Sequence, residues 1–249
     1  MKFSIITAAY NREATIGQAL RSVASQSHAN VEHVIIDGAS EDRTLAEITH
    51  HKTPNMLVIS EPDKGIYDAL NKGLNMATGD IIGLMHSDDF FAHKDVLTNV
   101  ARKFSATLSD AVYGDLDYVS AEDTNKVIRH WVSGEYTPDK LRRGWMPPHP
   151  ALFLRKSVID RWGGYDTSFR IAADYDSILR YFGRGNISAA YLPEVLVKMR
   201  VGGESNRSVE RIIRKSREDY RALKKNEIGG LGALMWKNLS KLRQFVNKG

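Results

Sequence analysis

The chain has 249 residues, 42% of them hydrophobic and 26% charged, which suits one large α/β domain or one domain with an appendage. It contains no cysteine, which excludes a disulfide framework and thiolate chemistry, and no apolar run approaches the ~18 residues of a membrane span. The net charge of +5 comes from the end of the chain, where the residues from Arg207 onward include twelve Lys and Arg and four Asp and Glu. Residues 1–206 therefore carry a net charge of about −3, which argues against a nucleic-acid groove in this part of the chain.

About the first hundred residues alternate between apolar runs and segments with helical spacing. We expect strands at residues 3–9, 31–36, 56–59 and 80–85, and helices at residues 13–26, 42–50 and 65–76. Strands that alternate with helices in this way are typical of βαβ units on a parallel sheet. Residues 1–105 are therefore predicted to form a nucleotide-binding half.

After residue 105 the expected elements become shorter and less regular. Strands are predicted at residues 112–115, 126–131 and 151–154, a stiff loop at 145–150, a helix at 171–181 and extended chain at 187–199. Two helices, roughly 207–226 and 231–246, follow on either side of Gly229-Gly230. We expect one domain over residues 1–206, with 106–206 as its second half, and a basic helical appendage at 207–249.

Polar residues follow three of the predicted strands. Thr7-Ala8-Ala9-Tyr10-Asn11 ends the first, Asp37 ends the second, and Asp88-Asp89 follows the fourth. The carboxyl ends of parallel strands meet at one edge of a sheet, where α/β proteins bind ligands. Tyr10 offers an aromatic wall for a nucleoside, and two adjacent carboxylates suit a divalent cation whose other oxygen ligands come from a diphosphate.

Each of these residues also has an ordinary structural interpretation. Asp37-Gly38 is a favourable turn pair. Asp88-Asp89 is compatible with a helix start, in which Asp caps the first turn and Phe90-Phe91 supplies the hydrophobic staple. The coincidence of polar residues after three strands favours a binding site over unrelated turns.

Asp174 lies near the start of the helix expected at residues 171–181. An Asp at this position is commonly an N-cap, worth ~1 kcal/mol. Beside a substrate hydroxyl it would instead serve as a general base. The sequence leaves both interpretations open.

Five segments, in order, resemble the motifs of family 2 glycosyltransferases, which have the GT-A fold. They are SIITAAYNR (4–12), VIIDGASEDRT (34–44), EPDKGIYDALNKG (61–73), GDIIGLMHSDD (79–89) and ADYD (173–176). The likeness is strongest to bacterial surface-polysaccharide transferases of the colanic-acid type. It implies an α/β fold with a mixed, mainly parallel sheet flanked by helices, in which residues 106–206 form the acceptor half.

The resemblance also implies a reaction and a site. The chain would transfer a sugar, with inversion, from a UDP-linked or similar nucleotide-diphospho-sugar donor to a saccharide or polyprenyl-diphosphate-linked acceptor. Asp174 would be the catalytic base, and Asp88 and Asp89 would bind Mn²⁺ or Mg²⁺. The donor nucleotide would be bound by residues at the strand ends: Thr7, Ala9, Tyr10, Asn11, Asp37, Lys64 and Asp88.

Three positions depart from the family pattern. His86 stands where the first carboxylate of an Asp-x-Asp motif is usual, and it either faces the nucleotide or simply ends a strand. Ala173 replaces the Glu of a Glu-Asp pair, which leaves Asp174 as the base. Many relatives carry a His after the last strand, where this chain reads MRVGGESN (199–206); Arg200 in this segment either binds the diphosphate or is a surface charge.

Acceptor contacts are expected from Trp145 and His149, which lie between the donor half and the base in the sequence, although Trp is also common in cores. The predicted helix at 231–246 is basic and amphipathic. It would lie on an anionic membrane surface, on the catalytic domain or on a second subunit of a homodimer.

We expect a cytoplasmic protein, or one peripheral to the inner face of the cytoplasmic membrane, because the apolar patch at 3–9 is too short for a signal peptide. The alternative function is a non-catalytic nucleotide- or sugar-binding module. A dinucleotide-dependent oxidoreductase is disfavoured because no Gly-x-Gly-x-x-Gly turn follows the first strand.

Overall fold

The computed structural model describes residues 1–201, 209–230 and 232–235. In these residues, nine strands form one sheet in the order β3-β2-β1-β4-β8-β6-β9-β5, and β7 pairs with β6 outside that path. The strands are β1 (Phe3–Ala9), β2 (Val31–Asp37), β3 (Met56–Ser60), β4 (Ile81–Leu84), β5 (Phe90–Phe91), β6 (Ala111–Val119), β7 (Val127–Trp131), β8 (Leu152–Arg155) and β9 (Ala189–Arg200).

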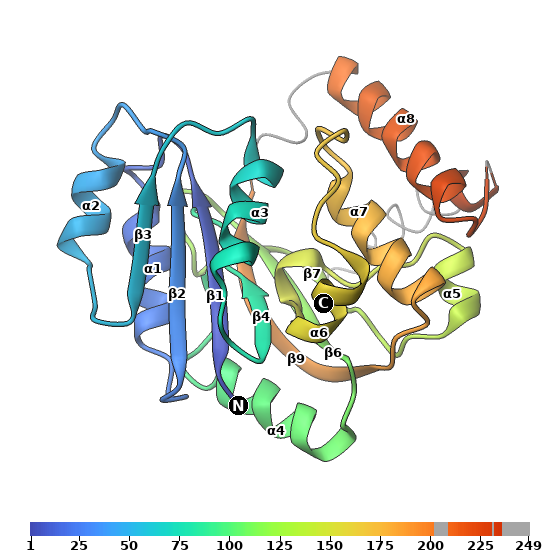
Figure 1. Ribbon diagram of the computed structural model, residues 1–249, viewed down its shortest axis with the longest axis horizontal. Coiled ribbons are helices and arrows are strands. Elements are labelled where there is room, and N and C mark those ends of the chain that lie inside the picture. The colour runs from blue at the N-terminus through green and yellow to red at the C-terminus, as the bar shows by residue number, and fades with distance from the viewer. Residues whose placement is uncertain (202–208, 231, 236–249) are drawn as a thin grey trace.

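Helices cover both faces of the sheet (Figure 1). They are α1 (Ile16–Ala24), α2 (Thr44–His50), α3 (Ile66–Met76), α4 (Val96–Thr107), α5 (Pro138–Arg142), α6 (Lys156–Trp162), α7 (Ala173–Ile178) and α8 (Val209–Lys225), with a 3₁₀ turn η1 (His149–Ala151) and a π-helical turn η2 (Leu179–Arg184).

The first half has the predicted alternation of strands and helices. Strands β3, β2, β1 and β4 are all parallel, and α3 packs against β1 and β2. Gly73 permits the close approach of α3, because a Cβ at this position would collide with the side chain of Ile6. The opposite face packs on α1, whose buried Ile16 and Leu20 contact Ile35.

The second half is antiparallel where the chain turns back on the sheet. β8 is antiparallel to β4 and β6, whereas β9 is parallel to β6. Phe90 and Phe91 form β5, which pairs with β9. The interpretation of Asp88-Asp89 as a helix cap with a Phe90-Phe91 staple is therefore wrong, because the two phenylalanines enter the sheet.

α8 packs against α7 (Figure 1). Its Ala222 and Leu223 are fully buried in the same cluster as Tyr175 and Leu179. The change of charge at Arg207 therefore does not coincide with a break in the core. Within the described ranges, no helix is long and apolar enough to cross a membrane. Most of the helix predicted at 231–246 lies outside the described residues, since only 232–235 fall within them.

Candidate functional site

The loops after β1 and β2 are joined by hydrogen bonds. The Asn11 backbone N–H donates to Ser40 Oγ at 2.9 Å, and Ser40 Oγ donates to Asp37 Oδ1 at 2.5 Å. Ser60 Oγ donates to Asp37 Oδ2 at 2.7 Å. Asn11 has a φ of 51°, a conformation that Asn tolerates better than most residues. The buried Asp37 thus holds the two loops together, and its carboxylate oxygens can accept further hydrogen bonds.

Tyr10, Gly38 and the loop before α3 meet beside Asp37. A Cβ at Gly38 would collide with Asp63 and touch the Tyr10 ring, so these groups are in close contact. Tyr10 is 55% exposed, as a surface that stacks on a ligand must be. Lys64 follows Asp63 and is exposed, and its backbone N–H donates to Asp68 Oδ2 at 3.0 Å.

Two of the residues expected to hold the donor lie deeper in the sheet. Thr7 is fully buried, and its hydroxyl is 2.8 Å from His33 Nε2. Burial lowers the pKa of His33 to about 3, so this imidazole is neutral. Ala9 is 4% exposed at the end of β1. The exposed edge is therefore formed by Tyr10 and Lys64 above the buried Asp37.

Asp88 and Asp89 lie beside Arg200, at the end of β9. The Arg200 backbone N–H donates to Asp89 Oδ1 at 3.2 Å. Its guanidinium donates to the Asp88 carbonyl oxygen and to Gln18 Oε1. Asp89 is 2% exposed, and burial together with Asp88 raises its pKa well above the usual range, against the opposing effect of Arg200. Arg200 is thus the cation at this pair of carboxylates.

His86 lies between the two halves of the site. Burial lowers its pKa, while the nearby carboxylates of Asp88 and Asp174 oppose that shift. Its ring centroid is 6.0 Å from that of His149. His86 therefore lies near both carboxylates and near His149.

His149 lies in the same cluster. Its Nε2 is 2.8 Å from the Tyr165 hydroxyl, and burial lowers its pKa to about 4, so its imidazole is neutral. Asp174 opposes this shift and is therefore close to His149.

Asp174 lies in the first turn of α7, but it is not the helix cap. The N-cap is Ala172, and no side chain of α7 caps the helix, so the N-cap interpretation of Asp174 is wrong. The Tyr67 hydroxyl donates to the Ile171 carbonyl oxygen at 2.7 Å and lies 3.4 Å from Asp174 Oδ1. Burial raises the pKa of Tyr67, and Asp174 raises it further.

Tyr67 is a site residue that the sequence did not single out. It occurs within the segment 61–73, and the likeness of this segment to a family motif could have identified Tyr67 as a candidate. Tyr165 and Gln18 carried no comparable signal, because each reaches the site from a segment without a motif.

Trp145 belongs mainly to the core of the second half. Its indole N–H donates to the Ser133 carbonyl oxygen at 2.8 Å. Its ring packs against Tyr136 and Phe182, at centroid distances of 5.4 and 6.3 Å. Because Trp145 is half-buried, only part of the ring is open to a ligand.

The carboxylates of Asp88 and Asp89 suit a divalent cation that takes its other oxygen ligands from a bound molecule. The described part of the chain holds no cluster of three or more His, Asp or Glu that could bind a metal alone. Asp88 is half-buried, and Asp89 is bonded to the Arg200 backbone. Two carboxylates leave most positions of a six-coordinate cation to diphosphate oxygens and water.

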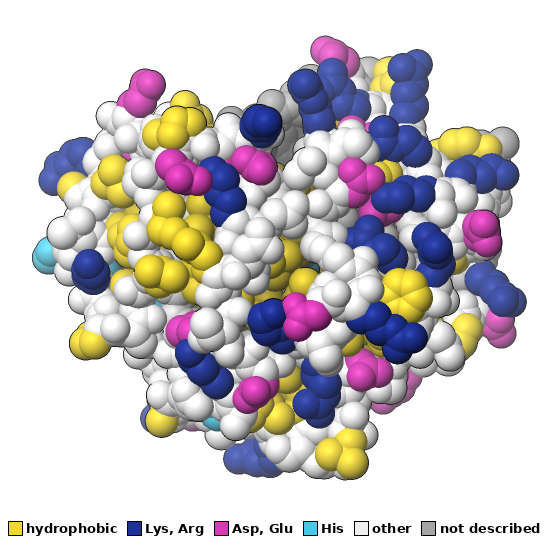
Figure 2. Space-filling model, in the orientation of Figure 1, with side chains coloured by type: hydrophobic (Ala, Val, Ile, Leu, Met, Phe, Trp, Pro, Cys, Tyr) yellow, Lys and Arg dark blue, Asp and Glu magenta, His cyan; other side chains and the backbone are white. Residues whose placement is uncertain are grey.

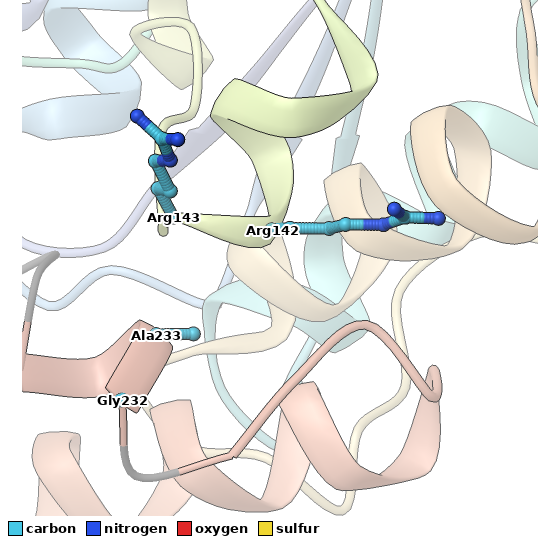
Figure 3. A pocket seen from close by; sticks show the side chains of 4 residues that line it. All are labelled: Arg142, Arg143, Gly232 and Ala233. Carbon is cyan, nitrogen blue, oxygen red and sulfur yellow. The ribbon is translucent and has the colours of Figure 1, made fainter.

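A separate surface hollow of about 240 Å³ lies between α5 and the segment 232–235. Arg142, Arg143, Gly232 and Ala233 line it, and the two arginine side chains extend in different directions (Figure 3). None of these residues belongs to the site described above.

The sequence matches one known family. Residues 4–163 match the family described as glycosyl transferase family 2, so the match runs from β1 to the end of α6 and stops before Asp174. A PGL/p-HBAD biosynthesis glycosyltransferase of Mycobacterium bovis is 32% identical over 215 residues, which cover 84% of this chain and 81% of that protein. An uncharacterized glycosyltransferase of Mycobacterium tuberculosis is 31% identical over 185 residues, which cover 71% and 67%.

Solved structures share the fold. S. aureus TarS 1-349 has a TM-score of 0.71 at 19% identity, over 100% of this chain and 75% of that chain. Its complex with UDP-GlcNAc has a TM-score of 0.69 at 20% identity, over 91% and 65%. The mannosyltransferase PcManGT from Pyrobaculum calidifontis, in complex with GDP-Man and Mn²⁺, has a TM-score of 0.67 at 18% identity, over 100% and 70%. These likenesses confirm the predicted fold class.

Proposed function

Because this chain belongs to glycosyl transferase family 2 and is a glycosyltransferase, we propose that it transfers a sugar with inversion from a UDP-linked donor. The observation that carries this proposal is the position of His86, whose pKa responds to both Asp88 and Asp174. The carboxylates assigned to the donor diphosphate and to the acceptor hydroxyl therefore both lie near the same imidazole. A single in-line displacement requires both groups at one sugar.

The donor half supplies complementary groups for a nucleotide. The exposed Tyr10 ring offers a stacking surface, and Asp37 offers acceptor oxygens held in place by Ser40 and Ser60. The exposed Lys64 follows the loop that touches Gly38. TarS, which shares this fold, has been solved with UDP-GlcNAc, which is consistent with a UDP-sugar donor.

The proposed chemistry needs one base. The acceptor hydroxyl oxygen attacks the anomeric carbon, its proton passes to Asp174, and the bond between that carbon and the diphosphate oxygen breaks. Tyr67 orients Asp174, and the Arg200 guanidinium adds positive charge near the leaving diphosphate. A Mn²⁺ or Mg²⁺ ion held by Asp88 and Asp89 would neutralise charge on that leaving group.

The acceptor side is proposed from the second half of the sheet. We assign His149 to acceptor contact because its ring lies near Asp174 and His86, with Trp145 at a less direct position. A saccharide or polyprenyl-diphosphate-linked acceptor in bacterial surface-polysaccharide synthesis fits an enzyme at the inner face of the cytoplasmic membrane. Exposed basic side chains gather over α8, which supports contact with anionic lipid (Figure 2); they are Arg214, Arg217, Arg221, Lys224 and Lys225.

The test combines a donor screen with one variant. Hydrolysis and thermal shift are measured with UDP-Glc, UDP-Gal, UDP-GlcNAc and GDP-Man, with and without Mn²⁺. We expect one UDP-sugar to be hydrolysed, and Mn²⁺ to bind weakly to the free protein but tightly with UDP. Asp174→Asn should abolish turnover while UDP still binds.

The outcomes separate the alternatives. Unchanged turnover by Asp174→Asn removes Asp174 as base. Sugar-nucleotide binding without turnover under any condition would favour a non-catalytic binding module. Tight binding of Mn²⁺ without UDP would contradict a cation held mainly by the diphosphate.

A further inference from the structure

The segment before α7 is capped by a residue of another helix. The backbone N–H groups of Ile171 and Ala172 donate to Glu218 Oε2 at 2.8 and 3.0 Å. The Arg170 N–H lies 3.2 Å from both carboxylate oxygens. Glu218 thus supplies from α8 the acceptors that no side chain of α7 offers.

The same segment is held from its other side by Tyr67. The Tyr67 hydroxyl donates to the carbonyl oxygen of Ile171, and the N–H of the same residue donates to Glu218. Ile171 is therefore fixed through both of its backbone polar groups. Asp174 follows three residues later in the first turn of α7, so its position depends on this segment.

A second set of contacts fixes the alignment of α8 on α7. Asp176 is fully buried and accepts from Asn226 Nδ2 at 2.9 Å and from Lys225 Nζ at 3.2 Å. Arg180, in the turn η2 that follows α7, donates to Asp176 at 2.8 Å. α7 and α8 lie side by side (Figure 1), and these bonds set which turn of α8 presents Glu218.

We propose that Glu218 is a positioning residue for glycosyl transfer, which acts by holding residues 170–172 so that Asp174 meets the acceptor hydroxyl. The inference rests on the proposed function, because it takes Asp174 as the base. A carboxylate at the N-terminal end of α7 is also favoured by the helix dipole. Glu218 does not touch the substrate in this assignment, and its effect on the reaction passes through the backbone.

The test compares three variants. Glu218→Ala removes every acceptor, Glu218→Gln keeps one accepting oxygen of similar reach, and Glu210→Ala is the control on the same helix. Glu210 is exposed and pairs with Arg214 of the same helix at 3.2 Å. The assay is release of UDP or GDP from whichever of UDP-Glc, UDP-Gal, UDP-GlcNAc and GDP-Man the wild type hydrolyses fastest, together with UDP affinity and thermal stability.

We expect Glu218→Ala to lower kcat on the order of 10²-fold, because small misplacements of a reacting group have effects of this size. KM for the sugar nucleotide and the affinity for UDP should stay within about twofold, since Glu218 bonds residues 170–172 and not the loops after β1 and β2. Glu218→Gln should recover most of the lost kcat, because Ile171 and Ala172 share one oxygen. Glu210→Ala should match the wild type.

Three results would overturn the inference. They are an unchanged kcat for Glu218→Ala, a parallel loss of kcat, UDP affinity and thermal stability, and a Gln variant as slow as the Ala variant. A different result would contradict the proposed function itself. If Asp174→Asn keeps full turnover, the base assignment is wrong; if Asp174→Asn is inactive and Glu218→Ala is normal, only the role of Glu218 is wrong.

Discussion

The backbone N–H of Arg200 donates to Asp89 Oδ1 at 3.2 Å, and this bond joins residues 111 positions apart. It ties the end of β9 to the loop after β4, and the Arg200 guanidinium reaches the Asp88 carbonyl and Gln18 from the same place. The resemblance to family 2 leads us to expect a His in the segment after the last strand, and residues 199–206 contain none. In this segment Arg200 supplies a permanent cation, since a guanidinium does not lose its proton in proteins.

Replacing Arg200 should weaken the diphosphate site. Arg200→Ala removes the cation beside Asp88 and Asp89, and we expect UDP affinity to fall about tenfold, as for one charge-assisted contact. Arg200→Lys should recover part of it, because Lys retains the charge without the planar fork. Isothermal titration with UDP measures both, with Arg102→Ala on α4 as an exposed control. Equal affinity of Arg200→Ala and wild type would remove Arg200 from the site.

Tyr67→Phe should slow the reaction with little change in donor binding. The variant loses the hydroxyl that donates to the Ile171 carbonyl and approaches Asp174. We expect kcat to fall about five- to tenfold, equivalent to about 1 kcal/mol for one hydrogen bond. Tyr136→Phe is the matched control, because its hydroxyl also donates to a carbonyl, that of Phe182, at 3.2 Å. Similar losses of kcat in both variants would argue against a specific role for Tyr67.

Stability should depend on Glu32 at acidic pH. Burial alone would raise the pKa of Glu32. Hydrogen bonds from Lys2, Ser4 and Thr78 outweigh burial and lower that pKa from 4.5 to about 2. Because the folded-state pKa lies below the unfolded value, the stabilisation is fully present above pH 4.5 and is lost as pH falls toward 2.

Glu32→Gln tests this pH dependence. We expect the variant to be less stable at pH 7 by about 1–3 kcal/mol, and the difference from wild type to shrink between pH 4.5 and 2. Urea unfolding at pH 7, 4 and 3 measures it. Glu61→Gln is a control, because Glu61 is half-exposed and its ion pair with Lys72 lies at the surface. A difference that is independent of pH would show that charge is not the cause.

Gly73→Ala should destabilise the fold although Ala favours helices. The added Cβ collides with Ile6 where α3 packs on β1, and overpacking of this kind costs about 1–3 kcal/mol. Asn75→Ala lies on the exposed side of the same helix and should be neutral or stabilising by about 0.5 kcal/mol. Thermal unfolding of both variants checks the contrast. A Gly73→Ala protein as stable as wild type would mean that α3 shifts at no cost.

Charge on α8 should govern binding to anionic vesicles. Replacing both Arg217 and Lys224 with Gln should lower the partition onto phosphatidylglycerol vesicles about tenfold or more, at ~1 kcal/mol per basic residue near the surface. Replacing the exposed Lys52 and Lys94 with Gln makes a control of equal charge change. Co-sedimentation, with phosphatidylcholine vesicles as the neutral surface, measures both. An equal loss of vesicle binding in both double variants would show that the net charge of the protein, and not its position on α8, governs binding.

Local patterns predicted the first half of the fold because each strand there is followed by its own helix. Residues 3–9 form β1 as predicted, and 65–76 forms α3 to within one residue. β5 was not predicted, because two phenylalanines form a strand only through pairing with β9. The predicted helix at 171–181 is an α-helix only as far as Ile178 and continues as the π-helical turn η2, which the helical spacing of its apolar residues did not indicate.

The sequence pointed to those candidate site residues that follow the ends of strands. Asp37 and Asp88 fall there because parallel strands share one edge. The contacts of Glu218 with Ala172, and of Arg200 with Asp89, were beyond prediction, since each joins segments remote in sequence. His86 illustrates the same limit, because its place between Asp88 and Asp174 depends on how α7 docks.

The bond between Asp176 and Asn226 has a consequence for how this chain can vary. Asp176 and Asn226 are both buried, so replacing one of them leaves the polar group of the other without its partner. We therefore expect α7 and the end of α8 to vary together among relatives. A hybrid that joins residues 1–201 of this chain to the last helix of a relative would carry a mismatched contact next to Asp174. The part of the chain that has to vary together therefore extends to Asn226, beyond residue 163, where the match to the family ends.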